Sequence, residues 1–375
     1  MILKHLSILN YKNIAQADLN FSQKINCFVG SNGEGKTNVL DAIYFLSFTH
    51  SATSAGSDSP CIRHGEELLM LAGEYDVNGT PENITCGLKM HQKKIIRRNQ
   101  KPYKRIAEHI GLLPLILVSP NDQELVNGGS EERRRYMDIV ISQFNPTYMA
   151  QLMRYNKALQ QRNALLKQLS ETFPAPAQEA QLALLEAYEQ MMAQSGEYIY
   201  NERAKFIDEL IPVFQRHYDR ISDGHETVSL TYSSHAQRGP LLEIIQRDRQ
   251  RDIAVGHSLH GIHKDDLTML LNDFPLRKEG SQGQNKTYLI SLKLAQFEFL
   301  SQTGSRTKPL LLLDDIFDKL DAQRVTKLIQ LVADDSFGQI FITDTNREHL
   351  DRIIAQAPGD HRIFSVKAGR VEVKM

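Results

Sequence analysis

The residues Gly30-Ser31-Asn32-Gly33-Glu34-Gly35-Lys36-Thr37 carry the clearest chemical signal in this chain. It follows the short apolar run Ile25–Val29, which predicts a strand, and it precedes a helical pattern of apolar residues that starts at Val39. A glycine-rich loop in this position curls so that its backbone N–H groups point inward, and the helix N-terminus adds a partial positive charge. Because the stretch fits the pattern G-x-x-x-x-G-K-[ST], we predict a phosphate-binding loop.

The last two residues of the loop have distinct expected roles. Lys36 would reach the β- and γ-phosphates of a nucleotide, and the hydroxyl of Thr37 would be a ligand of Mg²⁺. ATP and Mg²⁺ are therefore the expected cofactors. A chance glycine-rich turn is the alternative reading, which the complete match between a strand and a helix disfavours. The residues expected to contact the nucleotide here are Gly30, Ser31, Asn32, Gly33, Glu34, Gly35, Lys36, Thr37 and Asn38.

A second element complements the loop near the other end of the chain. Four leucines, Leu310–Leu313, lead directly into Asp314 and Asp315, a pattern that predicts a buried parallel strand with carboxylates at its C-terminal end. We expect Asp314 to hold the metal ion, directly or through water, and Asp315 to polarise the attacking water as a general base. With Lys36 they form the predicted catalytic set. The alternative is a strand that ends in a solvated acidic turn.

The tetrapeptide Ser281-Gln282-Gly283-Gln284 precedes an apolar helical stretch. A serine and a glycine at a helix N-terminus can offer a hydroxyl and N–H groups to an anion, although an ordinary capped helix explains the same pattern. The order of phosphate loop, tetrapeptide and acidic strand resembles the layout of ABC-type ATPases. In them the tetrapeptide corresponds to the signature motif, which meets the γ-phosphate across a dimer. The resemblance adds Ser281, Gly283 and Gln284 to the expected nucleotide contacts.

Further segments narrow this resemblance to the RecF family, over essentially the whole chain. The opening Leu9-Asn10-Tyr11-Lys12-Asn13 resembles the first strand of SMC-like and RecF-like heads. Ile262 and Asp318 stand where the family usually has proline and serine. Thr343 or Thr345 stands where many ABC proteins have a histidine. Other segments similar to RecF patterns are Pro120-Asn121-Asp122, Leu125–Gly129, Arg133–Asp138, Gly261–Leu267, Asp314–Asp321 and Ile340–Thr345.

The resemblance implies a fold and a function. The fold would be α/β, an ABC-type P-loop ATPase head with an antiparallel β subdomain and an inserted, mostly helical domain. The function would be that of a weak, DNA-stimulated ATPase that dimerises on ATP and binds duplex DNA and junctions with single strands. It would help to load the RecA recombinase together with RecO and RecR, in DNA repair, the SOS response to DNA damage and replication restart. Because Asp315 is one methylene shorter than the glutamate at the equivalent place in most ABC proteins, we expect slow hydrolysis, which would make ATP a timer for the dimer.

A basic segment offers local support for DNA binding. Eight cations and no acid lie within 89–105, although the formal net charge of the whole chain is only −1. In a hairpin, alternate residues share a face, so several cations would point the same way. A solvated edge hairpin that uses lysines to discourage strand pairing is the alternative. The residues named as candidate DNA contacts are Lys93, Lys94, Arg97 and Arg98.

Two further features have plainer explanations. Arg133–Arg135 would fan out around a helix, and some of these arginines are expected to pair with Glu131 or Glu132. His263 has no partner at metal-ligand spacing, which makes a structural role the better expectation.

The pattern of periodicities predicts a discontinuous α/β part. We expect the N-terminal part of the ATPase head in 1–125, a helical domain in 126–240 and the C-terminal part of the head in 241–375. Within the helical domain, the segment Phe173-Pro174-Ala175-Pro176 separates two amphipathic stretches, which predicts an antiparallel helix pair. An Asn78-Gly79 turn is expected between two strands in 66–99.

Composition bounds the remaining possibilities. The chain has 375 residues, a hydrophobic fraction of 41% and no apolar run long enough to span a bilayer. The alternating N-terminus lacks the features of a secretory signal. Three widely spaced cysteines, Cys27, Cys61 and Cys86, form no disulfide framework and suit a reducing compartment, so the expected location is the cytoplasm.

Other ATPases fit the sequence less well. A transporter subunit would place far fewer residues between Thr37 and Ser281, and an SMC clamp would need hundreds of heptad residues. A nuclease-joined ATPase would show a zinc hook or an appended acidic cluster, and a small-molecule kinase would not explain Ser281–Gln284. An SMC-like or nuclease-associated ATPase acting on DNA ends remains the alternative function.

Overall fold

The chain is divided by its contacts into two units. The first comprises Met1–Gln123, Arg216–His225 and Ser281–Met375, and the second comprises Glu124–Gln215 and Glu226–Gly280. This division differs from the expected helical domain at 126–240, because residues 216–225 belong to the first unit and residues 241–280 belong to the second. The computed structural model describes residues 1–54, 56–172, 178–222, 224, 226–303, 307–317, 320–333, 336–356 and 360–374.

A six-stranded, mostly parallel sheet forms the centre of the first unit, in the order β15-β14-β3-β13-β12-β8. Strands β12 and β13 are buried along their whole lengths, which explains their uninterrupted apolar runs. The strands are β3 (Ile25–Val29), β8 (Leu115–Val118), β12 (Leu310–Asp314), β13 (Ile340–Asp344), β14 (His361–Lys367) and β15 (Arg370–Val373). The helices of this unit include α1 (Lys36–Phe48), α9 (Gln282–Thr303), α10 (Ala322–Ala333) and α11 (Arg347–Gln356).

Parallel pairing aligns the carboxyl ends of three neighbouring strands. Asp344 of β13 lies opposite Val29 of β3, and Asp314 of β12 lies opposite Thr343 of β13. The phosphate loop therefore leaves β3 at the same edge of the sheet at which the acidic pair leaves β12. Segments almost 280 positions apart in sequence meet there because loops at the carboxyl ends of parallel strands share one edge.

The first unit also contains the expected antiparallel sheet, in the order β2-β1-β4-β5-β6-β7. The turn between β4 and β5 is at Asn78-Gly79, as predicted, and both residues have positive φ (54° and 82°). Two left-handed residues in succession match the twist of an antiparallel hairpin. The strands are β1 (Ile2–Tyr11), β2 (Ile14–Asn20), β4 (Leu68–Val77), β5 (Thr80–Lys89), β6 (Ile95–Arg98) and β7 (Lys101–Pro102).

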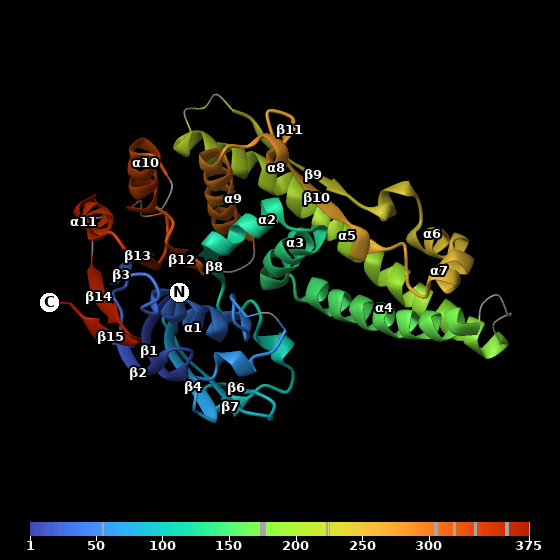
Figure 1. Cartoon of the computed structure of the whole chain (residues 1–375), viewed down its shortest axis with the longest axis horizontal. Coiled ribbons are helices and arrows are strands. Elements are labelled where there is room, and N and C mark those ends of the chain that lie inside the picture. The colour runs from blue at the N-terminus through green and yellow to red at the C-terminus, as the bar shows by residue number, and fades with distance from the viewer. Residues whose placement is uncertain are drawn as a thin grey trace. The chain divides into compact units, whose positions relative to one another are not determined.

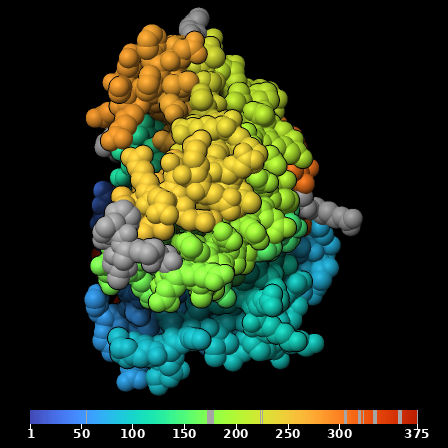
Figure 2. Space-filling model, turned by 90° about the vertical axis from the view of Figure 1, so that its right-hand side faces the viewer, coloured from blue at the N-terminus to red at the C-terminus, as the bar shows by residue number. Residues whose placement is uncertain are grey.

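Two long helices dominate the second unit, as the periodicity predicted. Helices α4 (Pro146–Thr172) and α5 (Glu179–Ile221) run side by side (Figure 1), and the expected break at Phe173–Pro176 lies outside the described residues. Helix α6 (Leu241–Arg247) and helix α7 (Arg249–Val255), yellow in Figure 2, cover part of the green helix pair, with α7 packed on α4.

A small sheet explains why 241–280 stays in this unit. Strand β10 (Asp266–Leu271) pairs antiparallel with β9 (Val228–Ser233) along its whole length and with β11 (Phe274–Pro275). The alternating pattern near residues 230 and 270 predicts strands but does not show that they pair with each other. The end of the second unit at Gly280 could therefore not be predicted from the sequence. The other helices are α2 (Gln123–Asn127), α3 (Ser130–Phe144) and α8 (Leu276–Glu279).

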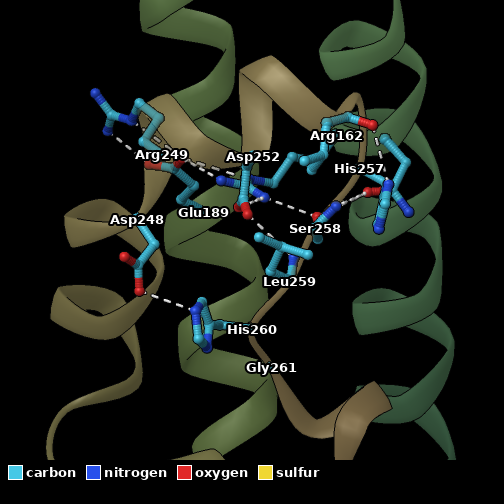
Figure 3. A network of polar contacts seen from close by, with 12 residues as sticks. Arg162, Glu189, Asp248, Arg249, Asp252, His257, Ser258, Leu259, His260 and Gly261 are labelled. Carbon is cyan, nitrogen blue, oxygen red and sulfur yellow. Dashed lines mark hydrogen bonds and ion pairs between the residues drawn. The ribbon is translucent and has the colours of Figure 1, made fainter.

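A buried ionic network fastens three helices of the second unit to one another (Figure 3). Arg162 of α4 lies 2.9 Å from Glu189 of α5 and 2.7 Å from Asp252 of α7, and it also donates to the Ser258 hydroxyl. Arg249 forms a second ion pair with Glu189 at 2.6 Å. The charges of this network are compensated within the fold. No helix in the described part of the chain is both long and apolar enough to cross a bilayer.

Candidate nucleotide site

The loop between β3 and α1 has the conformation that its glycines allow. Gly33 and Gly35 have φ of 82° and 111°, and Gly35 caps the N-terminus of α1. A Cβ atom at Gly30 would collide with the backbone oxygen of Val366 on β14, so this position needs glycine for close packing against the sheet. The sequence pattern therefore matches a backbone requirement at each of these positions.

Lys36 turns back over the loop that precedes it. Its Nζ donates to the backbone oxygens of Gly30 at 2.7 Å and Ser31 at 2.9 Å. The residue is buried, and burial lowers the pKa of the Lys36 amine, while Asp315 and Asp314 oppose this shift. The amine is thus held at the mouth of the loop by neutral acceptors, which an anion could replace.

The two residues predicted to bind the metal ion lie together. The Thr37 hydroxyl is 3.0 Å from both carboxylate oxygens of Asp314, and the Thr343 hydroxyl donates to Asp314 Oδ1 at 2.6 Å. Asp314 is only 5% exposed, and burial raises the pKa of its carboxyl group, while its hydrogen bonds to Thr343 and Thr37 oppose that shift. A carboxylate and a hydroxyl are the hard oxygen donors that Mg²⁺ prefers, so the residues fit this ion.

Asp315 follows directly, in a left-handed backbone conformation with φ of 49°. Such a conformation is uncommon for a residue other than glycine and costs of order 1–3 kcal/mol unless the surroundings enforce it. The Asp315 N–H donates to the Thr343 hydroxyl at 3.0 Å and to the Thr343 backbone oxygen at 3.3 Å. Neighbouring β13 thereby helps to enforce the turn that follows Asp314.

These elements enclose a pocket of about 160 Å³. Its walls combine backbone groups of the loop, one lysine, one threonine hydroxyl and two carboxylates. Such a wall suits a phosphate group accompanied by a divalent cation. The lining residues are Asn32, Gly33, Gly35, Lys36, Thr37, Asn38, Asp314 and Asp315.

Two predicted loop contacts also bind protein neighbours. The Glu34 carboxylate accepts a hydrogen bond from the Ala368 N–H in the turn between β14 and β15, and Asn38 donates to the Asn13 side-chain oxygen at 2.8 Å. Asn13 also donates to the Glu34 backbone oxygen at 3.1 Å. Sequence reasoning did not assign Asn13 to the site. The clue in the sequence was that Asn13 ends the Leu9–Asn13 segment, which resembles the first strand of SMC-like and RecF-like heads.

The predicted tetrapeptide caps helix α9. The Ser281 hydroxyl accepts a hydrogen bond from the Gln284 N–H at 3.2 Å, and the Gln284 side chain accepts one from the Ser281 N–H at 2.8 Å. This reciprocal arrangement is a capping box. Ser281, Gly283 and Gln284 do not line the pocket that contains Lys36. A single chain therefore does not bring all the predicted nucleotide contacts into one pocket.

The four candidate DNA contacts fall into two kinds. Lys94 lies 2.6 Å from Asp58, and Arg98 donates to Glu82 at 2.8 Å, so both are already neutralised by acids. Lys93 and Arg97 are exposed, as is the paired Arg98, whereas Lys94 is partly buried. Arg97 and Arg98 do not share a face, because successive residues of β6 point to opposite sides and Arg98 lies opposite buried Ile84.

Partners of the second arginine run differ from the expectation. Arg133 pairs with Asp266 at 2.6 Å, and Arg134 donates to the Asp265 backbone oxygen at 2.7 Å. Among the described contacts, Arg133 and Arg134 do not form the expected ion pairs with Glu131 or Glu132, because Asp266 of β10 pairs with Arg133 while Arg134 binds the Asp265 backbone oxygen and the Ser130 hydroxyl. Local spacing could not reveal these acids, which are more than 130 positions away.

His263 has the structural surroundings that were expected. Its ring lies 2.8 Å from the Tyr155 hydroxyl and 3.2 Å from the Ser258 backbone oxygen. Burial lowers the pKa of His263 to about 4, so the ring is neutral near pH 7. Among the described residues, no group of three or more His, Cys, Asp or Glu could hold a metal ion.

Comparison with known proteins adds independent information. Residues 2–101 match the family model described as the RecF/RecN/SMC N-terminal domain. A protein of Bacteroides fragilis named "DNA replication and repair protein RecF" is 57% identical over 372 residues, which cover 99% of this chain and 98% of that protein. The protein of the same name from Parabacteroides distasonis is 48% identical over 372 residues, with 99% of each chain covered.

Solved structures agree with these sequence matches. A structure of the recombination mediator protein RecF with ATP, in the RecFOR pathway, has a TM-score of 0.87 at 27% identity and covers 100% of this chain and 98% of its own. The Smc head domain from Pyrococcus furiosus has a TM-score of 0.59 at 16% identity, covers 100% of this chain and 96% of its own, and shows likeness of fold alone. The fold is thus the ABC-type ATPase head that the sequence predicted. The chain belongs to the RecF family of DNA replication and repair proteins.

Proposed function

We propose that this chain is an ATP-dependent, DNA-binding recombination mediator. The observation that carries the proposal is the meeting of Lys36, Thr37 and Asp314 in one pocket, in a chain 27% identical to a RecF solved with ATP. A phosphate loop and an acidic strand joined by a direct hydrogen bond are what an ATP–Mg²⁺ site requires. The family supplies the DNA-repair context.

Lys36 provides the first step of binding. Its amine exchanges the Gly30 and Ser31 backbone oxygens for phosphate oxygens, which carry full negative charge and are stronger acceptors. The N–H groups of the loop and of the first turn of α1 face the same anion. Loss of this amine removes the only lysine that lines the pocket within the described part of the chain.

Thr37 and Asp314 would hold Mg²⁺, which neutralises the phosphate charge when bound. In the structure the Thr37 hydroxyl donates to Asp314, so an oxygen lone pair remains for a cation. Asp315 lies at the rim of the pocket, where it would orient and deprotonate the attacking water.

Hydrolysis by this site should be slow. Asp315 is one methylene shorter than the glutamate that most ABC proteins carry at this place, so its carboxylate reaches less far toward a water. General-base catalysis contributes typically 10²–10⁴-fold, and part of that is lost. ATP then acts as a timer for a complex. A turnover near the typical enzyme value of about 10 s⁻¹ would contradict this expectation.

The tetrapeptide is proposed to act across a homodimer. Ser281, Gly283 and Gln284 stand at the start of α9 and do not line the pocket of their own chain. An ATP sandwiched between Lys36 of one protomer and Ser281 of its partner would favour the closed dimer, because the nucleotide binds the closed state more tightly. The capping hydrogen bond between Ser281 and Gln284 would open to accept the γ-phosphate.

The DNA-repair roles of the protein follow from its family. We place DNA contact at the exposed cations, Lys93 and Arg97 foremost, with duplex DNA and junctions with single strands as ligands. RecR and RecO are the proposed partners, and loading of RecA is the proposed outcome. The three free, buried cysteines suit a cytoplasmic location.

A mixing experiment tests the site and the dimer together. Lys36→Ala and Ser281→Arg proteins should each lack ATPase activity and ATP-dependent dimerisation. A mixed dimer contains one doubly defective site and one intact site, so mixing should restore part of both activities. Size-exclusion chromatography with and without ATP and a phosphate-release assay provide the readouts. Normal ATP binding by Lys36→Ala would overturn the nucleotide site. A tethered dimer that stays inactive with one intact site would overturn the composite arrangement.

A further inference from the structure

One side chain outside the predicted set touches both members of the acidic pair. The Thr343 hydroxyl donates to Asp314 Oδ1 at 2.6 Å and accepts the Asp315 N–H at 3.0 Å. Thr343 is fully buried and does not line the nucleotide pocket. Its donor and its acceptor capacity are therefore both used within the site, behind the surface that a ligand would meet.

The register of the sheet creates this contact. Thr343 lies opposite Asp314 in the parallel ladder between β12 and β13. In a parallel pair, neighbouring side chains on the same face project side by side, so a short hydroxyl reaches a carboxylate on the next strand. The Asp315 N–H also donates to the Thr343 backbone oxygen, which makes Thr343 the residue that receives the chain as it leaves the sheet.

The two oxygens of Asp314 differ because of this arrangement. Thr37 donates to both at 3.0 Å, whereas Thr343 binds Oδ1 alone. Among the described residues, Oδ2 receives only the Thr37 hydroxyl. Thr37 is itself the expected metal ligand, so its hydroxyl is the partner that ligand binding would reorient. The bond from Thr343 comes from behind the pocket and can persist.

We infer that Thr343 is a positioning residue for the metal-dependent step. It holds the Asp314 carboxylate by Oδ1, which leaves Oδ2 for the cation, and it fixes the left-handed turn that aims Asp315. This inference rests on the proposed function, because it assigns Thr343 to the same ATP–Mg²⁺ site. It also explains why a threonine occupies the end of β13, where valine or isoleucine would fill a buried strand position equally well.

Substitution by valine removes the hydroxyl and keeps the branched shape. Thr343→Val should raise the Mg²⁺ concentration needed for half-maximal binding of a fluorescent ATP analogue by about 10- to 100-fold, as is typical when a group that orients a metal ligand is lost. At saturating Mg²⁺, affinity for the analogue should stay within about threefold of the wild type, because Lys36 and the loop are intact. Thr343→Ser should restore the Mg²⁺ midpoint.

A purely structural hydroxyl would give a different result. It would lower the melting temperature of Thr343→Val and leave the Mg²⁺ midpoint unchanged. Thr231→Val, at an exposed position of strand β9 in the second unit, is the control for a threonine-to-valine change and should leave the midpoint unaltered. If Thr343→Val does not fold, Thr343→Cys replaces it, since a thiol is a weaker donor and acceptor of similar size.

Two outcomes separate this inference from the proposed function. A wild-type Mg²⁺ midpoint in Thr343→Val or Thr343→Cys, or a midpoint in Thr343→Ser that equals that of the valine variant, overturns the role of the hydroxyl. Both results leave the nucleotide site standing if Lys36→Ala still fails to bind the analogue. Unaltered binding by Lys36→Ala would instead overturn the site itself.

Discussion

In the second unit, Arg162 is fully buried between Glu189 and Asp252, whereas in the first unit Asp314 is nearly as buried but hydrogen-bonds only to hydroxyls within the described structure. A buried charge that is not held in an ion pair is costly, and such charges are concentrated at sites where a ligand completes their contacts. Lys36 differs from Arg162 in the same way, because its amine donates to neutral backbone oxygens, whereas Arg162 is paired with two carboxylates. Buried charges joined in ion pairs fasten helices together. Lys36 and Asp314 instead line one pocket without an ion pair between them in the described structure, which leaves both side chains for the proposed ligand.

The largest effect is expected from breaking the paired cluster. Arg162→Met keeps most of the side-chain volume but leaves Glu189 and Asp252 buried without their shared cation, which should cost about 3–5 kcal/mol in the free energy of unfolding. Urea denaturation followed by circular dichroism measures the loss. ATP binding by the folded fraction should match the wild type.

Arg249→Met is the matched control for this change. Arg249 binds the same Glu189 but is partly exposed, so its loss should cost about 1 kcal/mol. Equal losses in the two variants would show that burial of Arg162 does not set the strength of the network. Burial would then not distinguish the ion pairs of the second unit from ordinary surface pairs.

Changes in the acidic pair Asp314 and Asp315 should alter the rate of ATP hydrolysis more than the stability of the fold. Asp315→Asn removes the proposed base and should lower the hydrolysis rate about 100-fold, with ATP affinity within about threefold of the wild type. A phosphate-release assay measures the hydrolysis rate, and a nucleotide titration measures the affinity for ATP. Asp273→Asn, in an exposed turn with φ of 67°, is the control, because asparagine tolerates that conformation equally well. A rate unchanged in Asp315→Asn would mean that another group activates the water.

A pH titration sharpens the comparison within the second unit. His263 has a pKa of about 4 in the fold, below the ordinary value of 6.5, so the unfolded chain binds its proton first as pH falls. The stability due to the neutral ring is complete above pH 6.5 and is lost progressively toward pH 4, by roughly 3 kcal/mol in all.

His263→Gln removes this titration and provides the test. Unfolding free energies of both proteins between pH 7 and pH 4 should fall less steeply in the variant than in the wild type. Parallel curves would show that the His263 ring takes up its proton without cost to the fold. Other buried histidines are common to both proteins and cancel in the difference.

The smallest effect concerns cations on the surface. Neutralising Lys93 and Arg97 to glutamine should lower DNA affinity a few-fold and reduce the slope of log affinity against log salt by about 1.8, since each phosphate contact contributes about 0.9. Fluorescence anisotropy with duplex and gapped DNA between low and moderate salt measures the slope. Both substitutions lie on exposed positions, so folding should be unaffected.

Lys94→Gln with Arg98→Gln is the paired-charge counterpart. These cations already bind Asp58 and Glu82, so the salt slope should change little while thermal stability falls. A larger loss of slope in this second pair would mean that the ion pairs open on DNA. If neither double variant changes the salt slope, the DNA-binding surface lies outside these four cations.

The sequence alone determined the features that depend on neighbouring residues. The loop 30–37 is contiguous, and its glycines, Lys36 and Thr37 sit where local backbone geometry requires them. The acidic strand, the Asn78-Gly79 turn and the long helices likewise follow from short-range periodicity and turn chemistry. The order of these motifs was sufficient to indicate the RecF family.

Tertiary structure decided everything that depends on which distant segments pair. Strand register placed Thr343 on Asp314, the pairing of β5 with β6 brought Arg98 to Glu82, and β10 brought Asp266 to Arg133. Each of these contacts joins residues whose spacing has no fixed consequence along an unfolded chain. They exist because sheet ladders fix one strand against another and packing fixes helix α3 against β10. A shift of register by one residue would turn the strand side chains Thr343, Arg98 and Asp266 to the opposite face.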